Sequence, residues 1–262
     1  MRINRTLTGL AVGALAAGVL TGLGSAEAAT GSCEENVGFR ISSPDRYGDT
    51  GGTTIVIGLS AVTRTVSFHV HEGCELEVDD HWSVNSAYFH AAGTYDGTAT
   101  SLTDSVRVRV PRSDSAVGLR AAVVRLDDAT GTDNDTVSES GVFLKRRTQL
   151  RRFNVYIESP APRCGVRTGT TLTAKGRLIR ASWTAKAYRP YPNATVRLLF
   201  SAGNTAEHNL EDNIIRTDVT GPRGWGVFRF KPAFDARYLA HFGGNRSSGH
   251  TDSRWDHVNC TR

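Results

Sequence analysis

The chain has 262 residues, of which 39% are hydrophobic and 22% are charged, and its formal net charge is +5. Beyond residue 30 no segment approaches the ~20 apolar residues that a membrane span needs, so the composition excludes a later transmembrane helix. The length allows one large β domain or two of ordinary size.

Residues 1–29 have the pattern of a signal peptide. A basic start is followed by an apolar stretch of Ala, Gly, Leu and Val over residues 7–23, and by the small-residue run 25–29. This run provides a signal-peptidase site, and we expect cleavage after Ala28 or Ala29. A membrane anchor is the alternative, but a stretch this rich in Gly and Ala, closed by a cleavage site, makes a poor permanent anchor. We therefore expect a secreted, extracellular protein.

Four cysteines remain after cleavage: Cys33, Cys74, Cys164 and Cys260. An even number in an exported chain predicts two disulfides, for which three connectivities exist. We favour Cys33–Cys74 and Cys164–Cys260, because each pair closes within one candidate domain. Zinc ligation by these cysteines is not expected, because no C-x-x-C pair exists and the spacings are wide.

Short runs of alternating apolar and polar residues, separated by Gly, Asn, Asp and Pro, fill the rest of the chain. In the first half we predict strands at 36–42, 53–60, 64–71, 105–110, 118–126 and 141–147. In the second half we predict strands at 153–157, 170–178, 195–200, 214–219, 226–230, 237–242 and 255–260. Strands at this spacing predict an all-β protein of two Ig-like antiparallel β-sandwich domains.

The predicted join between the domains lies near Lys145–Arg152, a segment (KRRTQLRR) that is too charged for a core. The domains would then be residues 30–148, called the first half below, and residues 149–262, called the second half. The first half carries 11 Lys and Arg against 17 Asp and Glu, a net charge of −6, and the second carries 18 against 8, a net charge of +10. Either the two domains face each other electrostatically, or the basic one meets an anionic partner, or the asymmetry serves only solubility.

Four segments of the second half carry a resemblance: TLTAKGRLIRASW (171–183), YRPYPNATVRLLF (188–200), TDVTGPRGWGVFRF (217–230) and ARYLAHFGG (236–244). Their arrangement resembles the Ig-like β-sandwich domain of secreted actinomycete proteins. The first half is only loosely similar to a secreted β-sandwich. The resemblance implies a fold, but this fold hosts adhesion, sugar binding and plain spacing alike.

Histidines gather in the first half. His69 and His71 are two residues apart on a predicted strand, so both side chains leave from one face. Such a pair can bind zinc or copper, with His81 or His90 completing the ligand set. The competing interpretation is a solvated strand face whose histidines hydrogen-bond to their neighbours.

The segment DDATGTDNDTVSE (127–139) is rich in carboxylates and is predicted to be a loop. Calcium prefers such oxygen ligands, although EF-hand spacing fails here. The candidate calcium ligands are Asp127, Asp128, Asp133 and Asp135. An ordinary polar hairpin loop explains the same composition.

Three aromatic residues, Trp183, Tyr188 and Tyr191, lie around two prolines in what is predicted to be a strand-connecting loop. Their rings are candidates for stacking on sugars, and core packing or loop anchoring explains them equally well. No enzyme motif of the hydrolase, metalloprotease, P-loop or Rossmann type appears, so we expect no catalytic residues. Nucleic acid is not an expected partner, because no basic stripe with interleaved aromatics stands out.

The sequence thus predicts a non-enzymatic structural or binding protein of the extracellular space or cell envelope, without an obligatory cofactor. One alternative is a calcium- or metal-binding module. Another is an adhesin that binds cell walls or carbohydrates. The expected partner is an anionic cell-wall polymer or another envelope protein.

Overall fold

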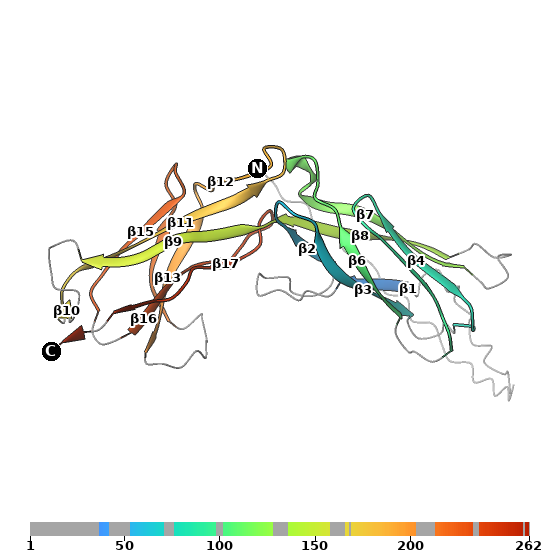
Figure 1. Ribbon diagram of the computed structural model, residues 1–262, viewed down its shortest axis with the longest axis horizontal. Helices are drawn as coiled ribbons and strands as arrows, with labels where there is room; N and C mark the ends of the chain where they lie inside the picture. Colours follow the sequence, from blue (N-terminus) through green and yellow to red (C-terminus); the bar gives the residue numbers. More distant parts are fainter. Residues whose placement is uncertain are drawn as a thin grey trace, which may run out of the picture. The chain divides into compact units, whose positions relative to one another are not determined.

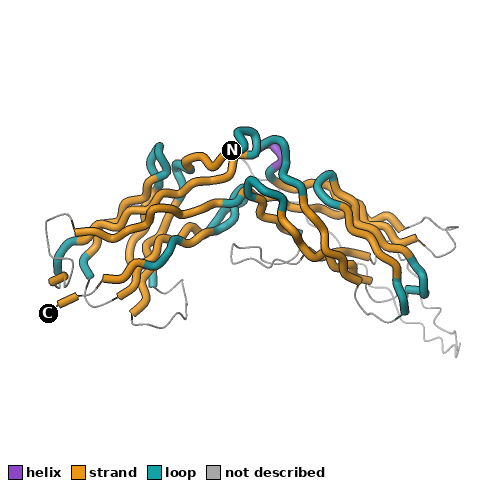
Figure 2. Tube along the Cα trace, viewed as in Figure 1, coloured by secondary structure: helices purple, strands orange, loops and turns teal. Residues whose placement is uncertain are grey.

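The computed structural model describes residues 37–41, 53–70, 76–97, 102–127, 136–157, 166–167, 169–202, 213–232, 236–258 and 260–261. Within these ranges the chain consists of strands and their connections, and the only helical segment is the short 3-10 helix Asp114–Ala116 (Figure 2). The all-β prediction is confirmed. No helix in these ranges has the length and hydropathy to cross a membrane. The predicted signal peptide lies outside them.

The first half contains two sheets (Figure 1). One has the order β1-β3-β6 and the other the order β2-β8-β7-β4-β5. Their strands are β1 Val37–Ile41, β2 Thr54–Ile57, β3 Val62–Val70, β4 His81–Ser86, β5 His90–Thr94, β6 Leu102–Val108, β7 Gly118–Asp127 and β8 Thr136–Arg146. All pairs are antiparallel except β2–β8, which is parallel.

The second half repeats the two-layer plan. Its strands are β9 Thr148–Ile157, β10 Val166–Arg167, β11 Leu172–Ser182, β12 Ala187–Pro190, β13 Thr195–Ala202, β14 Ile214–Val219, β15 Trp225–Phe230, β16 Ala236–Phe242, β17 Thr251–Asp252, β18 Asp256–Val258 and β19 Cys260–Thr261. Strand β11 pairs with β9 along one side and with β15 and then β12 along the other. The second sheet has the order β14-β13-β16-β17, with β18 also on β16. A short parallel pair, β10–β19, stands apart from both.

Burial alternates along strands such as β3, β6 and β15, and two separate hydrophobic clusters lie between the sheets. In β15, Gly226, Phe228 and Phe230 are buried, while Val227 and Arg229 are exposed, as predicted. The first cluster draws its strand residues from Phe39 to Leu144 and the second from Leu150 to Val258. Burial of one such Phe side chain contributes about 2–3 kcal/mol to folding. Two Ig-like sandwiches are therefore confirmed, whereas the predicted domain limits stay a prediction.

The charged segment 145–152 contains the passage from β8 of the first half to β9 of the second half. Lys145 and Arg146 end β8, β9 begins at Thr148, and only Arg147 lies between the two strands. Residues 148–152 belong to β9 although the segment is too charged for a core, because β9 lies at a sheet edge and needs apolar character only on its inner face. Thr148 and Leu150 are buried there, whereas Arg151 and Arg152 are exposed.

Trp183 joins the two halves. It follows β11 in the second half, yet its ring is 2% exposed and belongs to the hydrophobic cluster of the first half. Its indole N–H donates to the carbonyl oxygen of Gly58 at 3.0 Å. The core of the first half therefore includes a side chain from beyond the predicted boundary.

Candidate functional site

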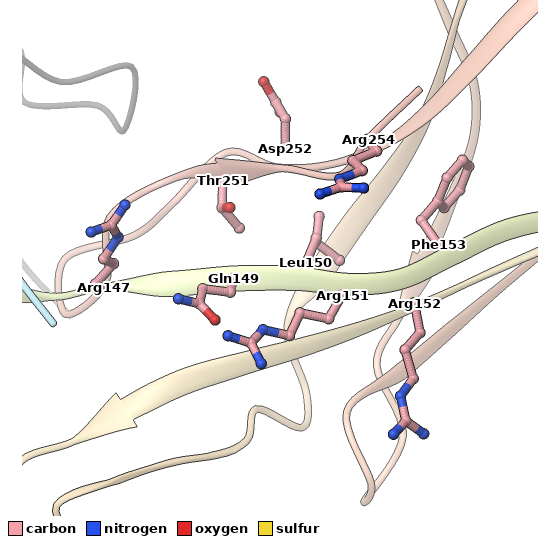
Figure 3. Close-up of a pocket in the computed structure, with 9 residues that line it drawn as sticks. All are labelled: Arg147, Gln149, Leu150, Arg151, Arg152, Phe153, Thr251, Asp252 and Arg254. Atoms are coloured by element: carbon pink, nitrogen blue, oxygen red, sulfur yellow. The ribbon is translucent and has the colours of Figure 1, made fainter. Parts of the chain in front are cut away.

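A groove of about 830 Å³ runs between β9 and the segment that carries β17 (Figure 3). Both strands lie at edges: among the described strands β9 pairs only with β11, and β17 only with β16. The groove is lined by Arg147, Gln149, Leu150, Arg151, Arg152, Phe153, Thr251, Asp252 and Arg254. In Figure 3 Leu150 points from β9 toward the strand that carries Thr251, and Arg254 reaches over the groove from that side.

A β-bulge in β9 sets the directions of the lining side chains. Arg177 of β11 is opposite Arg151 and Lys175 is opposite Asn154, so β9 holds one extra residue at this point. Arg152 lies within the bulge and has a φ of 54°, in the left-handed region that favours glycine. Its successor Phe153 packs against the second hydrophobic cluster. A bulge re-aims side chains in this way, and here it leaves two successive arginines exposed.

The groove is strongly cationic. It is lined by four arginines and one carboxylate, that of Asp252. Asp252 points away from β9 in Figure 3, and its Oδ1 lies 2.6 Å from Nδ1 of His241. A guanidinium presents a planar set of donors that matches a carboxylate or a phosphate. The site therefore suits an anion.

Gln149 adds a neutral polar group to the same groove. Its side-chain oxygen is buried and has no hydrogen-bond partner within the described part of the chain. A buried polar atom without a partner costs free energy, which a ligand hydroxyl or amide can recover. The groove thus offers both charge and a neutral hydrogen-bonding group to a bound molecule.

None of the arginines in the groove was singled out from the sequence. The segment KRRTQLRR was interpreted as the join between the domains, and Arg254 lies about a hundred residues further along the chain. The available signal was the order Thr148-Gln149-Leu150-Arg151, in which buried and outward residues alternate as in a strand.

The three predicted aromatic ligands lie in different surroundings. Trp183 is buried, so its ring has no face open to a sugar. The ring of Tyr191 lies 3.8 Å from the guanidinium carbon of Arg180, and its hydroxyl accepts a hydrogen bond from Asn245. Tyr188 belongs to β12 and not to a loop, and the guanidinium of the groove residue Arg151 lies 5.9 Å from its ring centre. Tyr188 is therefore the one of the three that adjoins the groove.

The described histidines among the predicted metal ligands lie on different strands, and the metal site itself stays a prediction. His69 lies on β3, while His81 and His90 lie on β4 and β5 of the other sheet, and His71 is outside the described residues. His90 contacts the side-chain oxygen of Asn85 at 2.6 Å. Over the described ranges, no three His, Cys, Asp or Glu side chains form a set that could hold a metal ion.

The calcium and disulfide predictions are largely outside the described residues. Asp127 ends β7 opposite His81, but Asp128, Asp133 and Asp135 are not described. Among the cysteines only the backbone of Cys260 is described, where it pairs in register with Val166, two positions after Cys164 in sequence. Both predictions stay predictions.

A second cluster of polar contacts surrounds Asp114, which sequence reasoning also missed. Its carboxylate accepts hydrogen bonds from the hydroxyl of Ser182 at 2.8 Å and from the backbone N–H of Trp183 at 2.6 Å. Arg146 lies 3.1 Å away. Burial by itself raises the pKa of Asp114, but these donors and the Arg146 charge outweigh it and hold the pKa below its ordinary value. The cluster fixes Trp183 in place.

The pKa of Tyr191 is also lowered in the folded protein. Burial by itself raises this pKa, because it favours the neutral phenol. The hydrogen bond from Asn245 and the adjacent Arg180 charge favour the phenolate and outweigh burial, so the pKa lies below its ordinary value. Arg180 also donates to the hydroxyls of Ser247 and Ser248. Tyr191 is thus part of a packed polar network and not an open binding surface.

Comparisons with known proteins found no matching family and no matching curated protein. One solved structure similar to this chain is the D0-D1 domain of intimin, with 11% identity over 79% of this chain and 94% of that one, at a TM-score of 0.26. Another is the Yersinia pseudotuberculosis adhesin InvE, with 11% identity over 80% of this chain and 57% of that one, at a TM-score of 0.27. A 1.5-MDa bacterial ice-binding adhesin also matches, with 13% identity over 80% of this chain and 61% of that one, at a TM-score of 0.27. The chain therefore spans less than two thirds of the InvE and ice-binding adhesin structures. Such TM-scores do not establish a shared fold, and the assignment to β-sandwiches rests on the strands and cores of this chain.

Proposed function

We propose that this chain is a non-enzymatic extracellular protein of the cell envelope that binds an anionic polymer in the arginine-lined groove of its second half. The observation that carries the proposal is the set of four arginines around a groove whose one carboxylate lies against a histidine. The net charge of +10 on the second half supports it, because a cationic surface attracts anions over several ångströms. Export through the predicted signal peptide would place the protein where such polymers occur.

The edge position of the groove suits a polymer. A site along two strand edges can follow the strands, and an extended chain matches such a site better than a compact molecule does. Arginines at such a site add affinity through charge-assisted hydrogen bonds, which are stronger than bonds between neutral groups. No catalytic step is needed for this role.

Binding to polygalacturonate and to long-chain polyphosphate, measured by titration calorimetry over a salt series, tests the proposal. We expect binding that weakens as ionic strength rises, because bound polymer releases its counterions. The variant Arg152→Ser/Arg254→Ser should lose about tenfold in affinity, since both arginines are exposed and each ion pair contributes at most about 1 kcal/mol. Polygalacturonate and polyphosphate separate a carboxylate preference from a phosphate preference.

The matched control is Arg107→Ser/Arg125→Ser, which removes the same charge from exposed positions on β6 and β7 of the first half. It should bind nearly as well as the wild type. Equal losses in the two double variants would show that net charge alone drives binding, and the groove would not be the site. Absence of binding to either polymer at low salt would refute the proposed function.

A further inference from the structure

The outer face of the sheet formed by β9, β11 and β15 is also cationic. Arg151 is directly opposite Arg177, and Arg177 is directly opposite Trp225. Residues that are directly opposite in an antiparallel pair project from the same face. In the next row Lys175 is opposite both Asn154 and Val227. The cations of the groove therefore continue onto β11.

The face carries no acidic residue in these two rows, which consist of Arg151, Arg177, Trp225, Asn154, Lys175 and Val227. Like charges directly opposite each other destabilise a sheet. An exposed Arg229 follows Val227 by two positions on β15 and so shares the face. Asp218 on the neighbouring β14 accepts a hydrogen bond from the backbone N–H of Val227 at 2.7 Å, so one carboxylate lies at the β15 edge of the sheet.

We infer that this outer face is a second contact surface for the ligand of the groove, and that the ligand is a linear polyanion that crosses the strands. The inference rests on the proposed function and adds a second surface, on the face of the sheet, to the site that the groove offers to an anionic polymer. Arg151 lines the groove and is also part of the outer face, so the two surfaces meet at this residue.

The spacing of the charges supports an extended ligand. Adjacent strands lie about 4.8 Å apart, and alternate residues of one strand about 7 Å apart. A small anion can engage one row at a time, whereas a polymer with repeated charges engages the groove and the face together. The second contact then forms at a high effective concentration, which raises the affinity for long chains only.

The test compares tripolyphosphate with long-chain polyphosphate on the full chain. The variant Lys175→Ser/Arg177→Ser/Arg229→Ser should bind tripolyphosphate within about twofold of wild type and lose about tenfold or more in affinity for the long chain. Its dependence on salt should also become shallower for the long chain, because fewer counterions are released. The groove variant Arg152→Ser/Arg254→Ser should weaken binding of both ligands.

The charge-preserving variant Lys175→Arg/Arg177→Lys guards against misfolding and should retain long-chain binding. Equal losses for both ligands in the face variant, or no loss for either, would overturn this inference and leave the groove as the site. A groove variant that binds both ligands like wild type would instead refute the proposed function. Salt-sensitive self-association that the face variant abolishes would assign the face to the acidic half of a second copy, which also overturns the inference.

Discussion

Asp114 ties residues from both halves of the chain together, through Arg146 on one side and the backbone of Trp183 on the other. Because its pKa is lowered in the folded protein, the ionised carboxylate favours folding. This contribution is complete above the ordinary pKa of 3.8 and is lost as the pH falls through the lower folded value. We predict that Asp114→Asn lowers the thermal midpoint at pH 7 and that the difference from wild type shrinks as the pH falls below about 4.

Thermal unfolding of both proteins between pH 7 and pH 2 checks this prediction. Arg146→Gln should reproduce part of the loss at pH 7, because it removes the opposite charge but leaves the hydrogen bonds from Ser182 and Trp183. A difference between Asp114→Asn and wild type that stays constant across the whole range would mean that the charge of Asp114 is not what stabilises the fold.

Gly224 closes the turn before β15 and has a φ of 78°. A Cβ at this position would lie 2.3 Å from the carbonyl oxygen of Leu178, which is backbone and cannot move aside easily. We predict that Gly224→Ala destabilises the protein by at least about 1–2 kcal/mol, the cost of a left-handed residue alone. The control is Gly221→Ala in the same turn, where the nearest atom would be 3.9 Å away. Urea unfolding should separate the two variants, and equal midpoints would contradict the argument.

At the scale of elements, the bulge of β9 holds the exposed, charged Arg152 in a backbone conformation that costs free energy. Arg152 occupies a left-handed conformation that glycine adopts without strain. We predict that Arg152→Gly raises the free energy of unfolding by up to about 1 kcal/mol, while it weakens polyanion binding. Urea unfolding and calorimetric titration of the same variant give both quantities. A variant that is more stable and binds as tightly as wild type would show that Arg152 does not contact the ligand.

Most strands could be predicted from the sequence, because alternation with β-branched and aromatic residues marks them. The exceptions have particular causes. In β4 the buried Trp82 and Val84 alternate with polar residues, but the run is short, and the partner strand β5 has Gly93 opposite Trp82, where the indole ring takes the place of a side chain. Strand β12 contains Pro190, which a strand tolerates at a sheet edge.

The candidate site was less accessible to prediction than the fold. The high positive charge of the second half was evident, and an anionic partner was one of the three interpretations that it allowed. The groove itself depends on the bulge at Arg152 and on the approach of Arg254 to β9. Neither a register shift nor a contact between residues so far apart in sequence leaves a pattern that one sequence reveals.

At the scale of the whole molecule, each half has its own sheets and core, yet the core of the first half includes Trp183 from the second. A boundary drawn by charge or by strand count separates Trp183 from the side chains that surround it. The stability of the first half therefore depends on a residue outside it. This dependence makes the two halves energetically coupled, because unfolding of the β11–β12 hairpin removes a large ring from the other core.

We predict that Trp183→Ala lowers the free energy of unfolding by about 3–5 kcal/mol and that the loss is felt mainly in the first half. Hydrogen exchange followed by mass spectrometry should show reduced protection in β2, whose Ile57 precedes the carbonyl of Gly58, and in β8, while β13 and β16 keep theirs. Trp183→Phe should lose less, because it keeps an aromatic ring in the core and gives up only the indole hydrogen bond. Protection lost only around β11 and β12 would mean that Trp183 stabilises its own hairpin and that the two halves fold independently.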